Sequence, residues 1–237
     1  MAESKKNIHE GHRERLRERF LLQGLEGFQE HEVLELLLTY AIPRIDVNEH
    51  AHRLLDRFGS LAGVFDAPIA ELKAVEGIGE RAASLIKLQP QLMRSYQLSR
   101  INREKERCLN SAKKAGAYIQ PFFFGCAEER VYLLCLDSGC RLLNCVQLSQ
   151  GSETFTTVPV KKLVETAVRE RAFSVILAHN HPTGVPIPSR EDVQTTRNLA
   201  KALSLVDIRL VDHLVVAGNE FASMAECGYF EGSWKGL

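Results

Sequence analysis

The sequence predicts two domains: an all-helical N-terminal domain followed by a C-terminal α/β domain. Through the first hundred residues apolar positions recur at helical spacing. Beyond residue 107, apolar runs typical of strands alternate with helical segments, which indicates a layered α/β structure. A polar, charged segment at 99–107 separates the two patterns and is typical of a linker or a solvated helix end. We therefore place the helical domain at residues 1–106 and the α/β domain at residues 107–237.

Three helices are expected before the first glycine-rich turn, at 9–23, 33–40 and 46–58. The first is dense in arginine and glutamate, with Leu16, Phe20 and Leu21 on one face. The second ends before Pro43, since a residue that precedes proline disfavours α geometry. Asp46 is a suitable N-terminal cap for the third. The expected α/β elements are helix 112–119, strands 130–136 and 141–148, helix 161–171, strand 173–178, helix 189–205, and strands 208–216 and 221–224.

Composition and charge exclude several classes of protein. The chain has 237 residues, of which 45% are hydrophobic, and thirty basic residues balance thirty acidic ones. Any contact with nucleic acid must therefore come from local placement of charge. No apolar run reaches the ~18 residues of a membrane span, and the N-terminus lacks the apolar core of a signal peptide. We expect a cytoplasmic protein without a membrane partner.

The segment Gly77-Ile78-Gly79 precedes a predicted helix and, within residues 58–90, resembles the helix-hairpin-helix of DNA-binding proteins. In such hairpins backbone amides and a helix N-terminus contact a phosphate without reading bases. A tight helix–helix turn with Ile78 in the local core is the alternative. Glu76 and Glu80 flank the segment and would repel a phosphate. Nonspecific DNA contact and a structural turn both stay open. The arginines at 13, 15, 17 and 19 alternate with glutamates, which favours a solvated, salt-bridged face.

The segment from His179 to Asp192 contains a set of candidate metal ligands. His179 and His181 are two residues apart at the end of an apolar strand, so both imidazoles project from one face. Asp192 follows in the first turn of a helix and can supply a third ligand. Two imidazoles and one carboxylate leave a fourth tetrahedral position open for water, which is typical of catalytic rather than structural zinc sites. We expect one Zn²⁺ per chain.

Ser189 lies three residues before Asp192. If Asp192 binds the metal, the Ser189 hydroxyl lies close enough to stabilise an oxyanion. Ser-x-x-Asp after a proline is also a capping-box-like helix start, which needs no metal. The two interpretations are compatible.

His-x-His, seven residues, Ser, two residues and Asp together resemble the signature of the JAMM (MPN+) zinc metalloproteases. The chain is similar to the bacterial RadC family, which joins a JAMM domain to an N-terminal helix-hairpin-helix region. The similarity includes residues 11–20, 58–86, 178–192 and 206–213. The resemblance implies a JAMM/MPN-type α/β domain with a cytidine-deaminase-like three-layer sheet.

By this resemblance His179, His181 and Asp192 are zinc ligands and Ser189 is a catalytic helper. The general base of such enzymes is a glutamate at the entry to the first strand, which Glu129 matches best. Glu128 would point to the opposite face of the strand, and Glu153 and Glu165 are further rivals. His213 and Asp212, on a later strand, are expected to serve packing or hydrogen bonds to ligands.

The leading hypothesis is a zinc-dependent hydrolase that acts on a peptide or isopeptide bond in an unknown peptide or protein substrate. The alternative is a DNA-associated, repair-linked module in which Gly77, Ile78 and Gly79 contact DNA and the JAMM fold is a scaffold. Zinc-activated water is not specific for peptides, so the bond that is cleaved stays open. The oligomeric state also stays open.

Overall fold

The computed structural model describes residues 8–43, 45–101, 107–150, 158–182 and 184–234. The chain forms two compact units, Met1–Met93 and Arg94–Leu237. They meet inside one helix, α6, ahead of the boundary after residue 106 that the sequence suggests. The end of that helix groups with the second unit, where the Arg94 guanidinium lies 3.4 Å from the Tyr132 hydroxyl.

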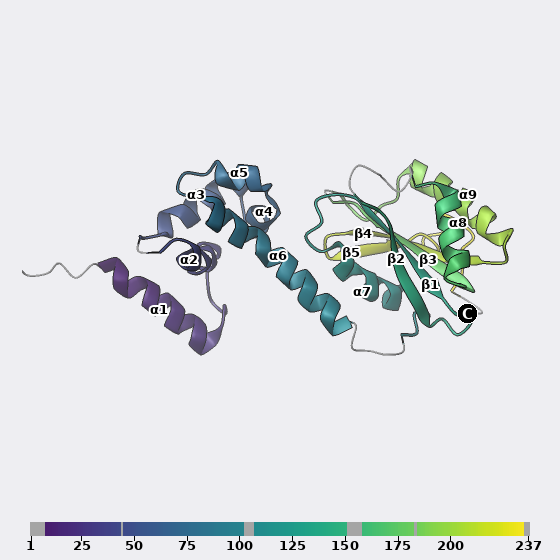
Figure 1. Cartoon of the computed structure of the whole chain (residues 1–237), viewed down its shortest axis with the longest axis horizontal. Helices are drawn as coiled ribbons and strands as arrows, with labels where there is room; N and C mark the ends of the chain where they lie inside the picture. Colours follow the sequence, from purple (N-terminus) through teal and green to yellow (C-terminus); the bar gives the residue numbers. More distant parts are fainter. Residues whose placement is uncertain (1–7, 44, 102–106, 151–157, 183, 235–237) are drawn as a thin grey trace, which may run out of the picture. The chain divides into compact units, whose positions relative to one another are not determined.

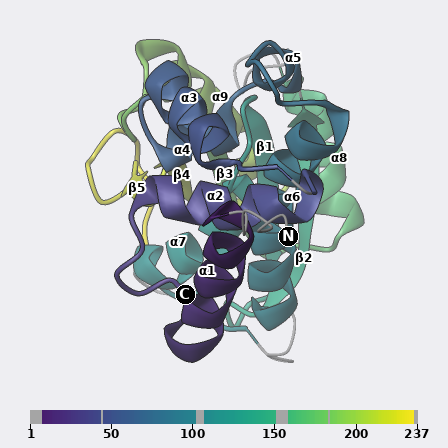
Figure 2. The ribbon, with the colours of Figure 1, turned by 90° about the vertical axis from the view of Figure 1, so that its left-hand side faces the viewer.

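The first unit is helical, as predicted, and Figures 1 and 2 show its helices running in several directions. Its helices are α1 (Ile8–Gln23), α2 (Glu30–Ala41), α3 (Asn48–Phe58), α4 (Leu61–Asp66), α5 (Ile69–Lys73) and the start of α6 (Glu80–Ile101). Its core is built from fully buried side chains that include Leu34, Leu38, Leu54, Leu72 and Ile86. The short helix α4 begins where the Ser60 hydroxyl accepts a hydrogen bond from the Gly63 amide.

The apolar face expected for α1 is only partly buried. Leu16 is buried, but Phe20 and Leu21 are exposed, Leu21 with 74% of its surface accessible. The helix packs chiefly against α2, and of the three apolar residues only Leu16 is buried.

The second unit is an α/β structure of three layers (Figure 1). A five-stranded mixed sheet has the order β2-β1-β3-β4-β5, in which β3 and β4 are parallel and the other neighbours antiparallel. Helices α8 and α9 cover one face and α7 covers the other. The elements are α7 (Ala112–Phe123), β1 (Arg130–Leu136), β2 (Leu142–Gln150), α8 (Val160–Arg169), β3 (Ser174–Asn180), α9 (Arg190–Ser204), β4 (Arg209–Ala217) and β5 (Glu220–Ser223).

Helix α7 is longer than predicted. Pro121 was expected to stop it at residue 119, but the helix continues to Phe123 with Pro121 in its last turn. Proline removes only its own N–H bond there, and burial of Tyr118 and Phe123 against the sheet keeps the turn helical. Among the described residues, no helix has the length and apolar character that a bilayer span requires.

Candidate metal centre

Strand β3 positions the first two residues of the site. It lies in the middle of the sheet between β1 and β4, and every residue of it is buried. The His181 amide donates to the Val216 carbonyl at 2.8 Å, so pairing with β4 continues past the end of the strand. His179 and His181 therefore project to the same side, and their Nε2 atoms lie 3.0 Å apart. The sequence predicted this shared face.

Helix α9 brings in the third residue. The Asp192 Oδ2 atom lies 3.7 Å from His179 Nε2 and 3.6 Å from His181 Nε2. Among the described residues, these three side chains are the group whose ligand atoms converge in a way that suits a metal ion. The helix start fixes the carboxylate, because Oδ2 accepts a 2.8 Å hydrogen bond from the Ser189 amide while Ser189 Oγ accepts one of 3.0 Å from the Asp192 amide. The predicted capping box is thus present.

Burial favours the neutral form of His179. Burial lowers the pKa of His179 to about 4; the Asp192 carboxylate opposes that shift and His181 adds to it. His181 Nδ1 lies 3.1 Å from the Val185 carbonyl oxygen. Since a carbonyl only accepts, that nitrogen carries the proton and the Nε2 atom of the neutral ring has a lone pair. A neutral imidazole with an available lone pair is the form that binds a metal.

Two residues lie behind the site: His213, for which packing or hydrogen bonds to ligands were expected, and Thr196. His213 on β4 is fully buried, and its Nε2 lies 2.7 Å from His179 Nδ1. Thr196 on α9 was not singled out at all, yet its hydroxyl lies 2.6 Å from His213 Nδ1. The only signal in the sequence was its spacing, one helical turn after Asp192. Contact with His213 depends on how α9 packs on β4, which the sequence does not display.

Asp212, the neighbour of His213, has a separate role. Its carboxylate is buried and accepts hydrogen bonds from the amides of His213 and Ala225, the Ser223 hydroxyl and the Trp234 indole. Burial raises its pKa, and these four hydrogen bonds oppose that shift. Asp212 therefore fastens the C-terminal segment to β4.

The candidate base lies at the entry to β1. Glu129 is half-buried and directly precedes Arg130, the first residue of the strand, while Glu128 is exposed. Strand register pairs Val131 with His179. Asn180 contacts both neighbours of Glu129: its Oδ1 accepts from the Arg130 amide at 2.8 Å and its Nδ2 donates to the Glu128 carbonyl at 3.2 Å. The segment that carries Glu129 is thereby tied to the strand that carries the histidines.

Of the two further candidates for the general base, the structure describes Glu165 but not Glu153. Glu165 lies on the exposed side of α8, where its carboxylate is 3.7 Å from the Lys161 ammonium. The buried residues of that helix include Leu163 and Ala167 on the opposite side. Glu153 lies outside the described residues. Nothing in α8 brings Glu165 toward the histidines.

Comparison with known proteins identifies the two units. A family model described as RadC-like JAB domain matches residues 109–229, and one described as UPF0758 N-terminal matches residues 8–84. A UPF0758 protein of Fusobacterium nucleatum is 32% identical over 225 residues, covering 93% of this chain and 97% of the relative. UPF0758 proteins of Bordetella petrii and Paraburkholderia phytofirmans are 35% and 36% identical over 215 residues, covering 91% and 90% of this chain and 95% and 82% of theirs. The chain belongs to the RadC family.

The glycine hairpin of this RadC family member has a structural explanation at its first glycine. Gly77 has φ of +83°, and a Cβ there would overlap the His50 imidazole. Ile78 is buried in the helical core, as the structural alternative predicted. A Cβ on Gly79 would meet nothing within 4 Å. The two glycines are therefore not equivalent, and only Gly79 tolerates a side chain without a clash.

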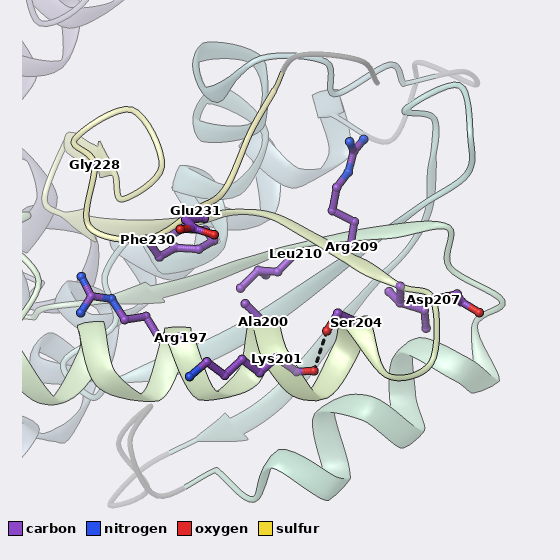
Figure 3. Close-up of a pocket in the computed structure, with 11 residues that line it drawn as sticks. Arg197, Ala200, Lys201, Ser204, Asp207, Arg209, Leu210, Gly228, Phe230 and Glu231 are labelled. Atoms are coloured by element: carbon purple, nitrogen blue, oxygen red, sulfur yellow. Dashed lines mark hydrogen bonds between the residues drawn. The ribbon is translucent and has the colours of Figure 1, made fainter.

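The RadC-like unit also has a separate pocket, whose lining residues Figure 3 shows. It has a volume of about 810 Å³ and lies between the second half of α9, the start of β4 and the segment 228–231. The cations Arg197, Lys201 and Arg209 line it together with the acids Asp207 and Glu231. It shares no residue with the candidate metal centre.

Proposed function

We propose that this RadC family protein is a zinc-dependent hydrolase of the JAMM type that acts on a peptide or isopeptide bond. The observation that carries the proposal is the convergence of His179 Nε2, His181 Nε2 and Asp192 Oδ2 from two separate elements. JAMM domains include metalloproteases, which makes hydrolysis the reaction class to test.

The donor set fits zinc. Zinc–ligand bonds of about 2.0–2.2 Å in a tetrahedron place neighbouring ligand atoms about 3.4 Å apart. The three separations here are 3.0, 3.6 and 3.7 Å. Two neutral imidazoles and one carboxylate carry a net negative charge, which a divalent cation neutralises. Three protein ligands also leave a position for a substrate or water, as catalytic zinc sites require.

A zinc ion held here supplies a Lewis acid and lowers the pKa of water. In the proposed mechanism Glu129 accepts the proton of the attacking water and delivers it to the leaving nitrogen. Alternation along β1 supports this role, because Val131 and Leu133 pack in the same cluster as Val175 and Leu177, on the side to which His179 belongs. Glu129 has the same parity as Val131.

Ser189 is proposed to donate to the oxyanion. Its Oγ accepts from the Asp192 amide, which leaves the hydroxyl proton for another acceptor. The residue is exposed, so a substrate can reach it. The three-layer order of α7, sheet, and α8 with α9 supports the cytidine-deaminase-like arrangement that we propose for the unit.

Metal analysis tests the proposal. Protein purified without added zinc is expected to contain about one equivalent, while His181→Ala and Asp192→Asn contain little. His52→Ala, an exposed histidine of the helical unit, is the matched control and should retain the metal. Less than half an equivalent in the unmodified protein, unchanged by either ligand variant, contradicts a zinc site.

Catalysis is tested separately with a library of defined peptides and isopeptides, read by mass spectrometry. The zinc-loaded protein should cleave a subset that Glu129→Gln binds but leaves intact. Glu165→Gln is the matched control, since that carboxylate lies on the outer face of α8. Equal loss of activity in both variants would show that Glu129 is not the general base.

A second candidate function is nonspecific DNA contact through the helix-hairpin-helix that Gly77, Ile78 and Gly79 resemble. The order of α5, two glycines and the start of α6 favours it. The charges around it favour the structural turn, because Lys73 pairs with Glu80 and Glu76 is exposed. Of the arginines of α1, Arg19 pairs with Glu32 at 2.7 Å.

Gly79→Asp tests the DNA candidate without a steric clash. A carboxylate beside the hairpin amides should weaken binding to a duplex and flatten its salt dependence, measured by fluorescence anisotropy across a salt series. Gly79→Ala is the control. Unchanged affinity and slope in the aspartate variant would show that the hairpin is structural.

A further inference from the structure

Three buried side chains form a hydrogen-bonded series behind the candidate metal centre. Thr196 on α9, His213 on β4 and His179 on β3 each have 0% of their surface exposed. The Thr196 Oγ1 to His213 Nδ1 distance is 2.6 Å and the His213 Nε2 to His179 Nδ1 distance is 2.7 Å. We refer to these residues as the Thr196–His213–His179 triad. It connects α9, β4 and β3.

The Thr196 hydroxyl proton has only one strong acceptor. Thr196 Oγ1 lies 2.6 Å from the Asp192 carbonyl oxygen, one helical turn earlier. A carbonyl cannot donate, so the single hydroxyl proton of Thr196 points at that oxygen. The sulfur of Met224, at 3.8 Å, is a weaker and more distant acceptor. Thr196 can then only accept from His213.

The direction of the Thr196 hydroxyl proton determines where the ring protons of His213 and His179 lie. His213 Nδ1 donates to Thr196, so in the neutral ring His213 Nε2 has a lone pair and accepts. The proton of the 2.7 Å contact must therefore belong to His179 Nδ1. Burial of both rings favours their neutral forms. His179 consequently has Nδ1–H and an unprotonated Nε2, and that Nε2 is the atom directed toward His181 and Asp192.

We propose that Thr196 and His213 are positioning residues that fix the His179 tautomer and orient its Nε2 toward the metal. This inference rests on the proposed zinc site and extends it. Asp192 is linked to the metal position in two ways. Its side chain is a candidate ligand, and its backbone carbonyl accepts the Thr196 hydroxyl proton. Residues that hydrogen-bond to a ligating histidine raise its basicity and fix its ring.

The tautomers can be read directly from the metal-free protein. Long-range ¹H–¹⁵N correlation spectra of the ¹⁵N-labelled full chain at neutral pH distinguish protonated from unprotonated ring nitrogens. Both His179 and His213 are expected to be protonated at Nδ1. A His179 ring protonated at Nε2 overturns the inference, whatever the affinity of the protein for zinc.

A pair of variants tests the consequence for binding. Thr196→Val keeps the shape but removes the hydroxyl, and Thr196→Ser keeps the hydroxyl. Zinc affinity, measured by competition with a chromophoric chelator, should fall about 10- to 100-fold in the valine variant and stay at the wild-type value in the serine variant. The valine variant should also lose the single Nδ1–H tautomer of His213. A purely structural role would lower the melting temperature and leave both readouts unchanged.

The outcomes separate this inference from the proposed function. If the wild-type protein takes up no zinc, the proposed function fails, and the tautomers of the metal-free protein still decide whether Thr196 and His213 fix the His179 tautomer. If the wild-type protein takes up zinc and Thr196→Val binds it equally well, the triad does not position His179, while the zinc site stands.

Discussion

Asn180 holds the segment that carries Glu129 through the two residues on either side of it. Its Oδ1 accepts from the Arg130 amide at 2.8 Å, and its Nδ2 donates to the Glu128 carbonyl at 3.2 Å. Asn180 lies between His179 and His181 and is 3% exposed. The residue between the two candidate ligands is therefore also the residue that ties the candidate base to their strand.

Replacement of Asn180 by alanine should release that segment. Hydrogen exchange of the Arg130 amide is expected to accelerate, because its acceptor is lost, and the free energy of unfolding should fall by about 1–3 kcal/mol. Zinc content should be unchanged, since no ligand is altered. Asn198→Ala, on the exposed side of α9, is the matched control. An Arg130 amide that exchanges at the wild-type rate would show that other contacts hold the segment.

Zinc should stabilise the folded protein measurably. A ligand that binds only the folded state adds about 2.7 kcal/mol when its free concentration is a hundred times its Kd. Thermal unfolding with zinc and with a chelator should therefore differ by several degrees. Asp192→Asn keeps an oxygen for the Ser189 amide but lowers the charge at the site. That variant should show a much smaller zinc-dependent shift, and a shift of wild-type size would exclude Asp192 as a ligand.

Acid should destabilise the metal-free protein below neutral pH. Burial lowers the pKa of His179 to about 4, whereas an unfolded histidine titrates near about 6.5. The unfolded state thus binds a proton first, so stability is complete above that value and is lost as pH falls toward about 4. The difference corresponds to a loss on the order of 3 kcal/mol. Burial lowers the pKa of His213 as well, in the same direction.

Denaturant unfolding of the chelator-treated protein across this pH range measures the effect. Bound zinc should suppress it, because the metal competes with the proton for the same nitrogen. Stability that is flat between about pH 7 and pH 5 would mean that His179 is accessible to solvent protons in the folded state.

The two hairpin glycines should respond oppositely to alanine. Gly77→Ala should cost about 1–2 kcal/mol for its left-handed backbone alone, and more because its Cβ overlaps His50. Gly79→Ala meets open space and should be neutral in the same urea titration. Combining Gly77→Ala with His50→Ala should recover the steric part but not the backbone part. An equal effect of the two single variants would contradict the described hairpin.

Much of the candidate site could be predicted because its information is local. Two residues on one strand share a face, so the spacing of His179 and His181 was sufficient to place both imidazoles together. The Ser189–Asp192 capping box is likewise a relation within one turn of a helix. Strand β1 was predicted with its observed bounds, since a strand buried on both faces leaves a short continuous apolar run.

The errors and omissions involve contacts between distant segments. Helical spacing places Phe20 and Leu21 on one face with Leu16, and only the packing of α1 on α2 shows that they are exposed. Pro121 appeared to end α7, and only burial of Phe123 against the sheet explains why it does not. Thr196 had no signal in the sequence beyond its spacing, one helical turn after Asp192.

The sequence by itself determined the family, the division into a helical and an α/β part, and the three residues that can bind a metal. Tertiary structure alone decided what surrounds them: the Asn180 amide beside Glu129, and the Thr196–His213–His179 triad. The reason is physical. Which side chains share a face follows from backbone periodicity, which sequence spacing encodes, whereas hydrogen bonds between α9, β4 and β3 exist only after the helix has packed on the sheet.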